Sequence, residues 1–338
     1  MEYINEIKEA PLDVCKGSET FLQSAMWGEF KSRFGWSAKA FLICLQKESF
    51  PLLVLCRRLA PGFSFAYIPW GPEFPMSFNH AEKPKAAAEI AKKIKPFLTH
   101  NTVFARFEPA WENDKLEIGD WAGFKKGTVV QAPDTVIVDL ATSCEEILAR
   151  MKPKWRYNIS LAAKKGVQVN VTGDLETFYN LLKETALRDG ISVHNFNYYK
   201  TLFEICEKQE KETLRLYTAS HENDTLAAIV VLFRGKDAVY LYGASSNEKR
   251  NLMAPYALQW RAMLDAKEAL CLNYDLFGIP PNEDPNHPMA GLYRFKTGFG
   301  GKIIRRAGSR DYPYNPFLYT LFSIAEKLRK NILKRSNR

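Results

Sequence analysis

The residues that decide the fold are 226–243, which read Leu-Ala-Ala-Ile-Val-Val-Leu-Phe-Arg-Gly-Lys-Asp-Ala-Val-Tyr-Leu-Tyr-Gly. Two runs rich in β-branched and aromatic residues flank Gly235-Lys-Asp, a composition typical of two strands joined by a tight turn. A strand-like run at 214–219 precedes this pair, and residues 254–269 follow it with apolar side chains at helical spacing. The next apolar run, 271–277, again indicates a strand. We therefore expect three strands, a helix and a fourth strand in that order.

The same order of elements occurs earlier in the chain. Apolar runs at 38–45, 51–58 and 63–68 are typical of strands, residues 82–98 repeat apolar positions at helical spacing, and 102–107 returns to a strand pattern. The two copies share this pattern with little residue identity, which indicates a duplicated unit. The sequence therefore predicts an α+β fold with two similar domains, each a central mixed sheet flanked by helices.

Chain length supports two domains, because 338 residues exceed the usual size of a single hydrophobic core. A helix start at Ser143 and Cys144 suggests the boundary, so we predict domains at residues 1–145 and 146–314. Residues 315–338 form a basic amphipathic helix that we expect to complete the first domain with its apolar stripe. Docking of this helix on a membrane surface is the alternative interpretation.

Composition is that of an ordinary globular protein, with 46% apolar and 25% charged residues. The N-terminus carries acids in place of a basic stretch, so no secretory signal is expected, and no apolar run approaches the roughly 18 residues of a membrane span. Six cysteines and five histidines are scattered without the spacing of a metal site. We therefore expect a cytoplasmic protein with reduced thiols, no metal and no cofactor.

The net charge of +9 is unevenly distributed. Residues 147–173 contain no carboxylate, while basic residues recur there: Arg150, Lys152, Lys154, Arg156, Lys164 and Lys165. An ordinary solvated helix face interleaves acids that form ion pairs with such bases, and this segment has none. The block therefore favours contact with phosphate groups or nucleic acid.

Residues 292–301 read Leu-Tyr-Arg-Phe-Lys-Thr-Gly-Phe-Gly-Gly and place the cation of Lys296 between aromatic rings and beside glycine backbone. Such a cation suits an anion or a developing oxyanion. The three glycines also suit a tight turn that requires positive φ, and the residues alone leave both interpretations open.

Several motifs occur in one order along the chain and share aromatic, glycine and basic residues: Trp27-Gly-Glu-Phe-Lys31, Tyr67-Ile-Pro-Trp-Gly-Pro72, Met151-Lys-Pro-Lys-Trp-Arg156, Glu184-Thr-Ala-Leu-Arg188-Asp-Gly190, Tyr240-Leu-Tyr-Gly-Ala-Ser245, Tyr274-Asp-Leu-Phe-Gly278 and Tyr293-Arg-Phe-Lys296 with the glycines after it. This ordered set resembles the Fem (FemABX) family of aminoacyl-tRNA-dependent transferases. The resemblance implies two tandem GNAT-like domains, in agreement with the duplication. Some members carry a long helical arm thought to contact tRNA, and residues 198–212 are too short for one. The chain therefore resembles the compact members.

The resemblance implies transfer of glycine, alanine or serine from aminoacyl-tRNA to the stem-peptide amine of a peptidoglycan precursor, either lipid II or UDP-MurNAc-pentapeptide. It assigns stabilisation of the oxyanion to Lys296, with the ring of Phe295 near the tRNA end. The other substrate contacts that we expect are the cations Lys31 and Arg188 at the pyrophosphate, and Tyr67, Tyr240 and Tyr242 along the acceptor channel. Glu73 and Asp275 are weaker candidates for a general base. The bases expected to contact tRNA are Lys152, Lys154, Arg156, Lys164 and Lys165. We expect a monomer.

Two other functions remain open. An acyl-CoA-dependent N-acyltransferase of the same fold would need a glycine-rich pyrophosphate loop at the start of a helix, and residues 247–253 match such a loop poorly. A non-catalytic RNA-binding module would use the basic block at 147–173. Replacing Lys296 separates these functions, because an RNA-binding module would barely respond to it, whereas changes at Lys154 and Arg156 would weaken RNA binding.

Overall fold

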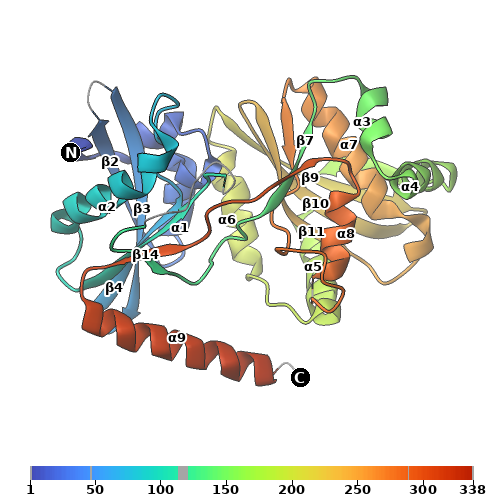
Figure 1. Cartoon of the computed structure of the whole chain (residues 1–338). Helices are drawn as coiled ribbons and strands as arrows, with labels where there is room; N and C mark the ends of the chain where they lie inside the picture. Colours follow the sequence, from blue (N-terminus) through green and yellow to red (C-terminus); the bar gives the residue numbers. More distant parts are fainter. Residues whose placement is uncertain (1, 46–47, 113–120, 288, 337–338) are drawn as a thin grey trace. The chain divides into compact units, whose positions relative to one another are not determined.

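Two seven-stranded sheets organise the described part of the chain, one in each of two units (Figure 1). The computed structural model describes residues 2–45, 48–112, 121–287 and 289–336, and for 329–336 it describes the backbone. The first unit comprises residues 1–133 and 305–338, and the second comprises 134–304. The chain thus leaves and re-enters the first unit earlier than the expected positions near 145 and 315. The reason is that, near each point where the chain passes from one unit to the other, a short strand pairs with a strand that lies far away in the sequence.

The first sheet has the order β1-β2-β3-β4-β5-β14-β6. Its pairs are antiparallel except for the parallel pair β4–β5, which the helix α2 connects. The strands are β1 (Ile4–Ala10), β2 (Ser37–Leu45), β3 (Glu48–Ala60), β4 (Phe63–Trp70), β5 (Thr102–Pro109), β6 (Lys125–Lys126) and β14 (Arg310–Pro313). The helices α1 (Ala25–Ser32) and α2 (Lys83–Ile94) bury apolar side chains, and α9 (Pro316–Ser336) packs on β5. The short 3-10 helices are Leu12–Gly17, Phe21–Gln23, His80–Glu82 and Lys95–Phe97.

The second sheet has the order β13-β7-β12-β11-β10-β9-β8, and its parallel pair is β11–β12. The strands are β7 (Thr135–Asp139), β8 (Gln168–Thr172), β9 (Glu212–His221), β10 (Asp224–Arg234), β11 (Asp237–Ser245), β12 (Asn273–Asp275) and β13 (Lys302–Ile304). The helices are α3 (Cys144–Arg150), α4 (Pro153–Lys164), α5 (Leu175–Asp189), α6 (Phe196–Cys206), α7 (Ala254–Glu268) and α8 (Ala290–Thr297), with a 3-10 turn at Arg250–Leu252.

The duplication predicted from the sequence is confirmed by the sheet topology. Strands β2-β3-β4-β5 and β9-β10-β11-β12 each make two antiparallel pairings and then a parallel pairing across a helix, α2 or α7. Each repeat gains a further antiparallel strand beside its fourth strand, β14 beside β5 and β7 beside β12. The fold is therefore the predicted α+β arrangement of two similar units.

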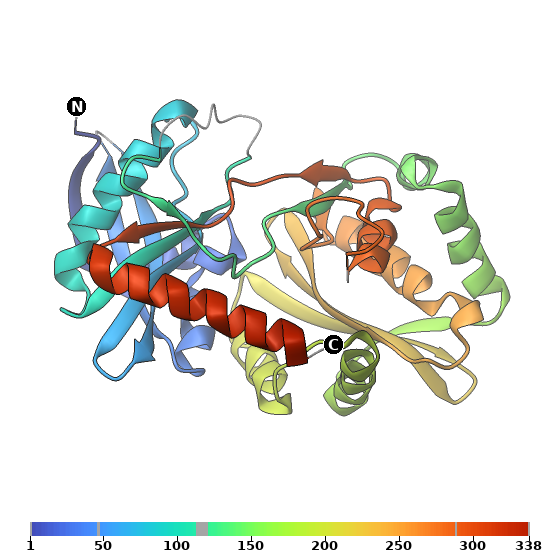
Figure 2. The same cartoon turned by 60° about the horizontal axis from the view of Figure 1, so that its bottom comes forward.

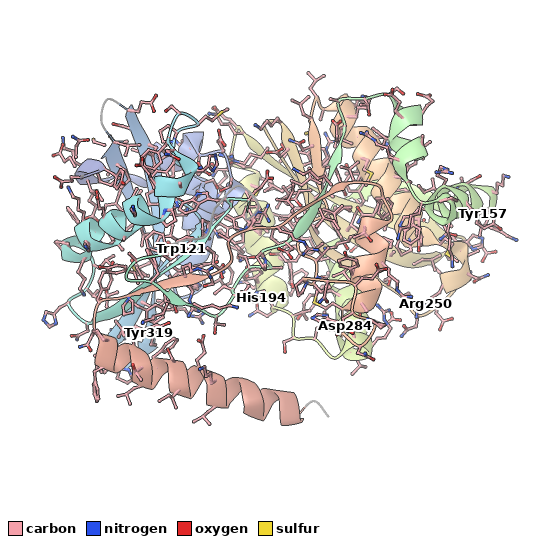
Figure 3. The ribbon with its side chains drawn as sticks, in the orientation of Figure 1. Trp121, Tyr157, His194, Arg250, Asp284 and Tyr319 are labelled. Carbon is pink, nitrogen blue, oxygen red and sulfur yellow. The ribbon has the colours of Figure 1, made fainter. Side chains whose placement is uncertain are left out.

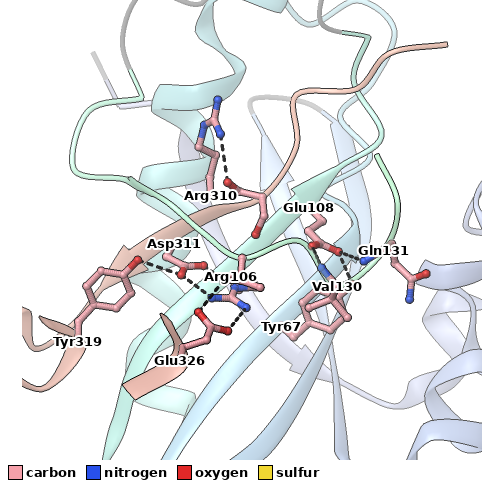
Figure 4. Close-up of polar contacts among 11 residues, drawn as sticks. Tyr67, Arg106, Glu108, Val130, Gln131, Arg310, Asp311, Tyr319 and Glu326 are labelled. Atoms are coloured by element: carbon pink, nitrogen blue, oxygen red, sulfur yellow. Dashed lines mark hydrogen bonds and ion pairs between the residues drawn. The ribbon is translucent and has the colours of Figure 1, made fainter. Parts of the chain in front are cut away.

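A buried ion pair holds the returning strand β14 in the first sheet. Asp311 lies opposite Arg106 of β5, and the guanidinium donates to both carboxylate oxygens at 2.7 Å. Tyr319 at the start of α9 is buried here (Figure 3) and its hydroxyl donates to Asp311 at 3.0 Å. Glu326 lies 3.5 Å from Arg106 (Figure 4). The helix α9, which follows β14 directly in the chain (Figure 2), is therefore tied to the same charges. No helix of the described ranges is both long and apolar enough to span a bilayer.

Candidate active site

Lys296 lies inside the second unit, on the helix α8 (Ala290–Thr297), with 5% of its surface exposed. The residues predicted to form a glycine-bordered turn thus begin as a helix, which ends directly after the lysine. The ammonium nitrogen donates to the carbonyl oxygens of Gly278 at 2.9 Å and Phe277 at 3.3 Å. The cation is therefore fixed against the loop that follows β12.

Asp275, the last residue of β12, shapes this loop. Its Oδ1 accepts the backbone N–H of Phe277 at 2.7 Å and the hydroxyl of Thr135 on β7. Phe277 has φ of +58°, a left-handed conformation that a non-glycine residue adopts only when its surroundings impose it. The carboxylate thus orients the carbonyl groups that hold Lys296. Asp275 remains a weaker candidate for a general base, because these contacts occupy one of its oxygens.

Burial lowers the pKa of Lys296 to about 7, and the negative charge of Asp275 acts in the opposite direction. Tyr240 on β11 places the centre of its ring 5.2 Å from the ammonium, a distance at which a ring face attracts a cation. Burial raises the pKa of Tyr240 to about 12, so its hydroxyl stays protonated at neutral pH. A side chain at Gly243 would overlap that hydroxyl, which explains the glycine in the Tyr-Leu-Tyr-Gly motif.

Phe295 precedes Lys296 on α8 and is half-buried in an aromatic cluster. Its ring meets Tyr256 and Phe299 edge to face, with centres 5.2 and 5.1 Å apart. Its carbonyl accepts the indole N–H of Trp155 at 2.9 Å, so α4 and α8 are joined beside the lysine. The cluster holds α8 rigidly, as a site that positions one cation requires.

The glycines after Lys296 serve close packing. A Cβ on Gly298 would collide with the indole ring of Trp155. Gly300 has φ of +80°, and a Cβ there would meet the carbonyl of Arg150, while Gly301 presses against the backbone of β7. Gly300 therefore serves a turn that needs positive φ, as the first interpretation requires, whereas close packing accounts for Gly298 and Gly301.

Tyr242 occupies a neighbouring aromatic group formed with α6. Its ring lies edge to face on Tyr199 with centres 5.2 Å apart, and its hydroxyl is hydrogen-bonded to that of Tyr198. Burial raises the pKa of Tyr242 well above its ordinary value. The phenol is therefore a neutral hydrogen-bonding group at physiological pH.

Lys31 lies in the first unit, at the end of α1, among three aromatic rings. Its ammonium is 5.5 Å from the ring centre of Trp27, 5.9 Å from Phe30 and 5.7 Å from Trp36. Arg57 places its guanidinium 5.2 Å from the ring centre of the same Trp36. Burial and the charge of Arg57 lower the pKa of Lys31 to about 8. Two cations that share one indole form a local positive field suited to a phosphate group.

Tyr67 is buried beside this group, with its ring centre 5.7 Å from that of Trp36. Its hydroxyl donates to Glu108 at 2.5 Å, and the carboxylate also accepts the backbone N–H groups of Val130 at 2.5 Å and Gln131 at 3.0 Å. Burial raises the pKa of Glu108 despite these donors. The carboxylate borders a cavity of about 10 Å³, room for one water, that is lined by Trp70, Pro109, Gln131, Pro133, Arg306 and Gly308.

Arg188, at the end of α5, is engaged in local hydrogen bonds. Its guanidinium donates to the carboxylate of Asp189 at 2.9 Å, to the carbonyl of Ser245 at 2.8 Å and to the side chain of Asn247 at 3.1 Å. The last two contacts join α5 to the end of β11. A phosphate at Arg188 would have to exchange with some of these partners.

Glu73 binds backbone. Its two carboxylate oxygens accept the N–H groups of Glu19 at 2.8 Å and Thr20 at 2.7 Å, which fixes the turn before the 3-10 helix Phe21–Gln23. Burial raises its pKa, and these backbone donors act against that shift. These contacts give Glu73 a structural role, and its role as a general base stays a prediction.

The basic block forms the surface of α4 and its flanks. The exposed bases of the block are Arg150, Lys152, Lys154, Lys164 and Lys165, and Tyr157 among them exposes its ring (Figure 3). Arg156 differs, because its guanidinium donates to the carbonyls of Met151 at 2.6 Å and Ala149 at 3.3 Å and so caps α3. Four of the five predicted contacts are therefore free to reach a polyanion at the surface, and Arg156 is a positioning residue.

The structure brings Lys296, Phe295, Tyr240 and Asp275 together in the second unit and joins Lys31 to Tyr67 through Trp36 in the first. Sequence reasoning missed Glu108 and Arg57. The available signal for Glu108 was its position, because it places a carboxylate near the end of β5, a strand in which every residue is buried. Arg57 carried no signal, because only strand pairing and Trp36 bring it to Lys31. No group of three or more His, Cys, Asp or Glu side chains in the described ranges could hold a metal ion.

The sequence profile of the FemAB family matches residues 117–216 and 204–327. Among curated relatives, the lipid II:glycine glycyltransferase of Staphylococcus saprophyticus is 25% identical over 395 aligned positions, which cover 94% of each chain. The protein of the same name from Staphylococcus epidermidis is 23% identical and covers 93% of this chain and 92% of its own length.

Solved structures give the same fold. The crystal structure of FemX superimposes with a TM-score of 0.79 at 21% identity, over 94% of this chain and 99% of that one. A tandem GNAT protein from the clavulanic acid biosynthesis pathway superimposes with a TM-score of 0.53 at 12% identity, over 92% and 99% of the two chains. Both units are therefore GNAT-like, as predicted.

Proposed function

Because the chain belongs to the FemAB family, we propose that it is an aminoacyltransferase that moves glycine from glycyl-tRNA to lipid II. Relatives that match over nearly their whole length are named lipid II:glycine glycyltransferases, which favours glycine over alanine or serine and lipid II over the nucleotide-linked precursor. The tRNA donor follows from the family resemblance of the motifs. Exposed lysines on α4 supply a surface to which its phosphates can bind.

The reaction has a clear electrostatic requirement. The stem-peptide amine attacks the ester carbonyl of glycyl-tRNA, so that a C–N bond forms and the C–O bond to the ribose breaks. The attacking amine loses a proton and the ribose hydroxyl gains one. Between these steps the carbonyl oxygen carries a negative charge, and a fixed cation or hydrogen-bond donor at that oxygen lowers the barrier.

The buried ammonium of Lys296 carries the proposal. It is held by two neutral carbonyl groups and the face of Tyr240, and with a pKa of about 7 it is charged in roughly half of the molecules at neutral pH. A developing oxyanion stabilises the charged form, so its contact is stronger in the transition state than in the ground state. This is the property that a catalytic cation needs.

We place the pyrophosphate of the precursor at Lys31 and Arg57 in the first unit. These cations converge on Trp36, and burial of Lys31 strengthens its interaction with an anion. Arg188 is the weaker candidate for this anion because its guanidinium already binds Asp189, Ser245 and Asn247. Tyr67 and Tyr242 remain proposed contacts of the acceptor.

The test is a transfer assay with the purified full-length chain. Glycyl-, alanyl- and seryl-tRNA are each mixed with lipid II in detergent or with UDP-MurNAc-pentapeptide, and products are weighed by mass spectrometry. We expect a glycine adduct on lipid II that Lys296→Met largely abolishes. An adduct formed from acyl-CoA and not from any charged tRNA would establish the N-acyltransferase instead. Retention of charged tRNA without any product would leave only the RNA-binding module.

A further inference from the structure

The helix α9 is attached to the first unit by one face. Tyr319 is buried, Phe322 stacks at an angle on Phe104 with ring centres 4.9 Å apart, and Glu326 accepts from Thr128 at 2.7 Å. Positions 319, 322 and 326 follow the spacing of one helical stripe. This stripe of α9 therefore packs on the first unit, as we expected from the sequence.

A second stripe of α9 stays uncovered and is apolar. Its members are spaced four, three and four residues apart and expose half or more of their surface: Phe317 71%, Leu321 50%, Ile324 51% and Leu328 58%. Single exposed apolar residues are common, whereas a continuous row of four large ones along three turns marks a contact surface.

Apart from one acid, the charged residues of α9 are all basic. Glu326 is the single acid between residues 316 and 336, and it faces inward to Arg106 and Thr128. The second half of the helix carries the bases Lys327, Arg329, Lys330, Lys334 and Arg335 in its sequence. An apolar row followed by a cluster of cations complements a surface with apolar depth and anionic head groups.

We propose that α9 docks in the interface of an anionic lipid bilayer, with the row Phe317, Leu321, Ile324 and Leu328 in the acyl boundary and the basic end at the head groups. A second copy of the chain is the less suitable partner, because its α9 carries the same excess of bases and offers no further acid to match them. The proposal rests on the surface of α9 and does not depend on which precursor the enzyme uses.

The test is flotation of the full-length protein with vesicles of phosphatidylcholine alone and of phosphatidylcholine mixed with phosphatidylglycerol. We expect binding to the mixed vesicles that falls as salt is raised. The double variant Leu321→Glu/Ile324→Glu should bind at least about tenfold more weakly. Met76→Glu is the matched control, because Met76 is a 94% exposed apolar residue of the same unit outside α9, and it should change binding less than about twofold.

Folding is checked by thermal melting, which these exposed substitutions should leave within a few degrees of the wild type. Equal binding of the double variant and the wild type overturns the proposal, as does the absence of binding to both vesicle types. Light scattering measures whether the apolar row is instead an interface between two copies of the chain. That is the result if the wild type is a dimer, the double variant is a monomer and neither binds vesicles. Transfer to lipid II in detergent is measured in parallel, so failure of membrane docking is distinguishable from failure of the proposed activity.

Discussion

The ammonium of Lys296 and the ring of Tyr240 lie 5.2 Å apart in the interior of the second unit. The other contacts of the ammonium that are resolved are carbonyl groups of the loop after β12. Each of these partners is neutral, and the nearby Asp275 acts on the lysine through its charge. A cation whose direct contacts are neutral can still be stabilised strongly by negative charge that develops beside it. A direct ion pair would reduce this effect.

Replacing this cation tests its role in the transition state. Lys296→Met keeps most of the apolar stem of the side chain and removes the charge, and we expect a loss of about 3 kcal/mol in transition-state stabilisation, roughly a hundred- to a thousandfold in kcat/KM. Steady-state transfer of glycine to lipid II measures it. Arg294→Met, at an exposed position on the same helix, is the control and should retain activity within about twofold. Equal losses in both variants would show that α8 and not the charge is responsible.

The lowered pKa of Lys296 predicts how stability depends on pH. The folded amine titrates near 7 and the unfolded one near 10.5, so between these values the unfolded chain binds more protons and the free energy of unfolding rises with pH. Below pH 7 both forms are protonated, and the cost of burying the charge is complete. Relative to Lys296→Met, the wild type should therefore gain a few kcal/mol between pH 7 and pH 10. Urea unfolding of both proteins across this range measures the difference, and parallel curves would sink the assignment.

Asp275 offers a separate test of the same charge. Asp275→Asn retains an oxygen that can accept from Phe277 and Thr135 but loses the negative charge that raises the pKa of Lys296. We expect the basic limb of the activity profile, on which activity falls as the lysine loses its proton, to move to lower pH. A uniform loss at every pH, with an unmoved limb, would instead indicate a purely structural role or a role as general base.

The repeats were predictable from sequence because their strands are neighbours along the chain. Strands β2 to β4 and β9 to β11 pair consecutively, so periodicity and turn residues define them. The strands at the crossings are short and pair across long separations, as Asp311 does with Arg106, and no local pattern reveals that. These strands account for the shifted unit boundaries.

The candidate site, like the fold, was predictable from sequence only where the signal is local. The motif at 293–301 identified Lys296 and Phe295, whereas the helical state of α8 was missed because the glycines after it suggested a turn. Those glycines are required by Trp155 and by backbone of α3 and β7, which lie far away in sequence. The contacts of Glu73 and Arg156 were likewise hidden, because each binds backbone groups that only the folded chain presents.

The cation pair in the first unit predicts an effect on substrate binding. Lys31→Met should raise KM for lipid II by about ten- to a hundredfold with little change in kcat, because a bound pyrophosphate interacts with this cation before and during the reaction. Arg57→Met should act in the same direction. Arg33→Met is the control, since Arg33 follows α1, is exposed and lies 3.9 Å from Glu29. If kcat falls while KM is unchanged, Lys31 acts on the chemical step and the assignment is wrong.

The ion pair between Arg106 and Asp311 predicts how the returning C-terminal segment stabilises the first unit. Arg106→Met leaves the buried carboxylate of Asp311 without its main partner and should lower the free energy of unfolding by about 3 to 5 kcal/mol. The exposed Lys125→Met on β6 is the control and should change it by less than about 0.5 kcal/mol. In Arg106→Met/Asp311→Leu both charges are absent, so most of the lost stability should return, because apolar groups of similar volume can replace a buried pair. Urea unfolding distinguishes the cases: if the double variant is as unstable as the single one, packing of β14 depends on the shape of these side chains and not on the compensation of their charges.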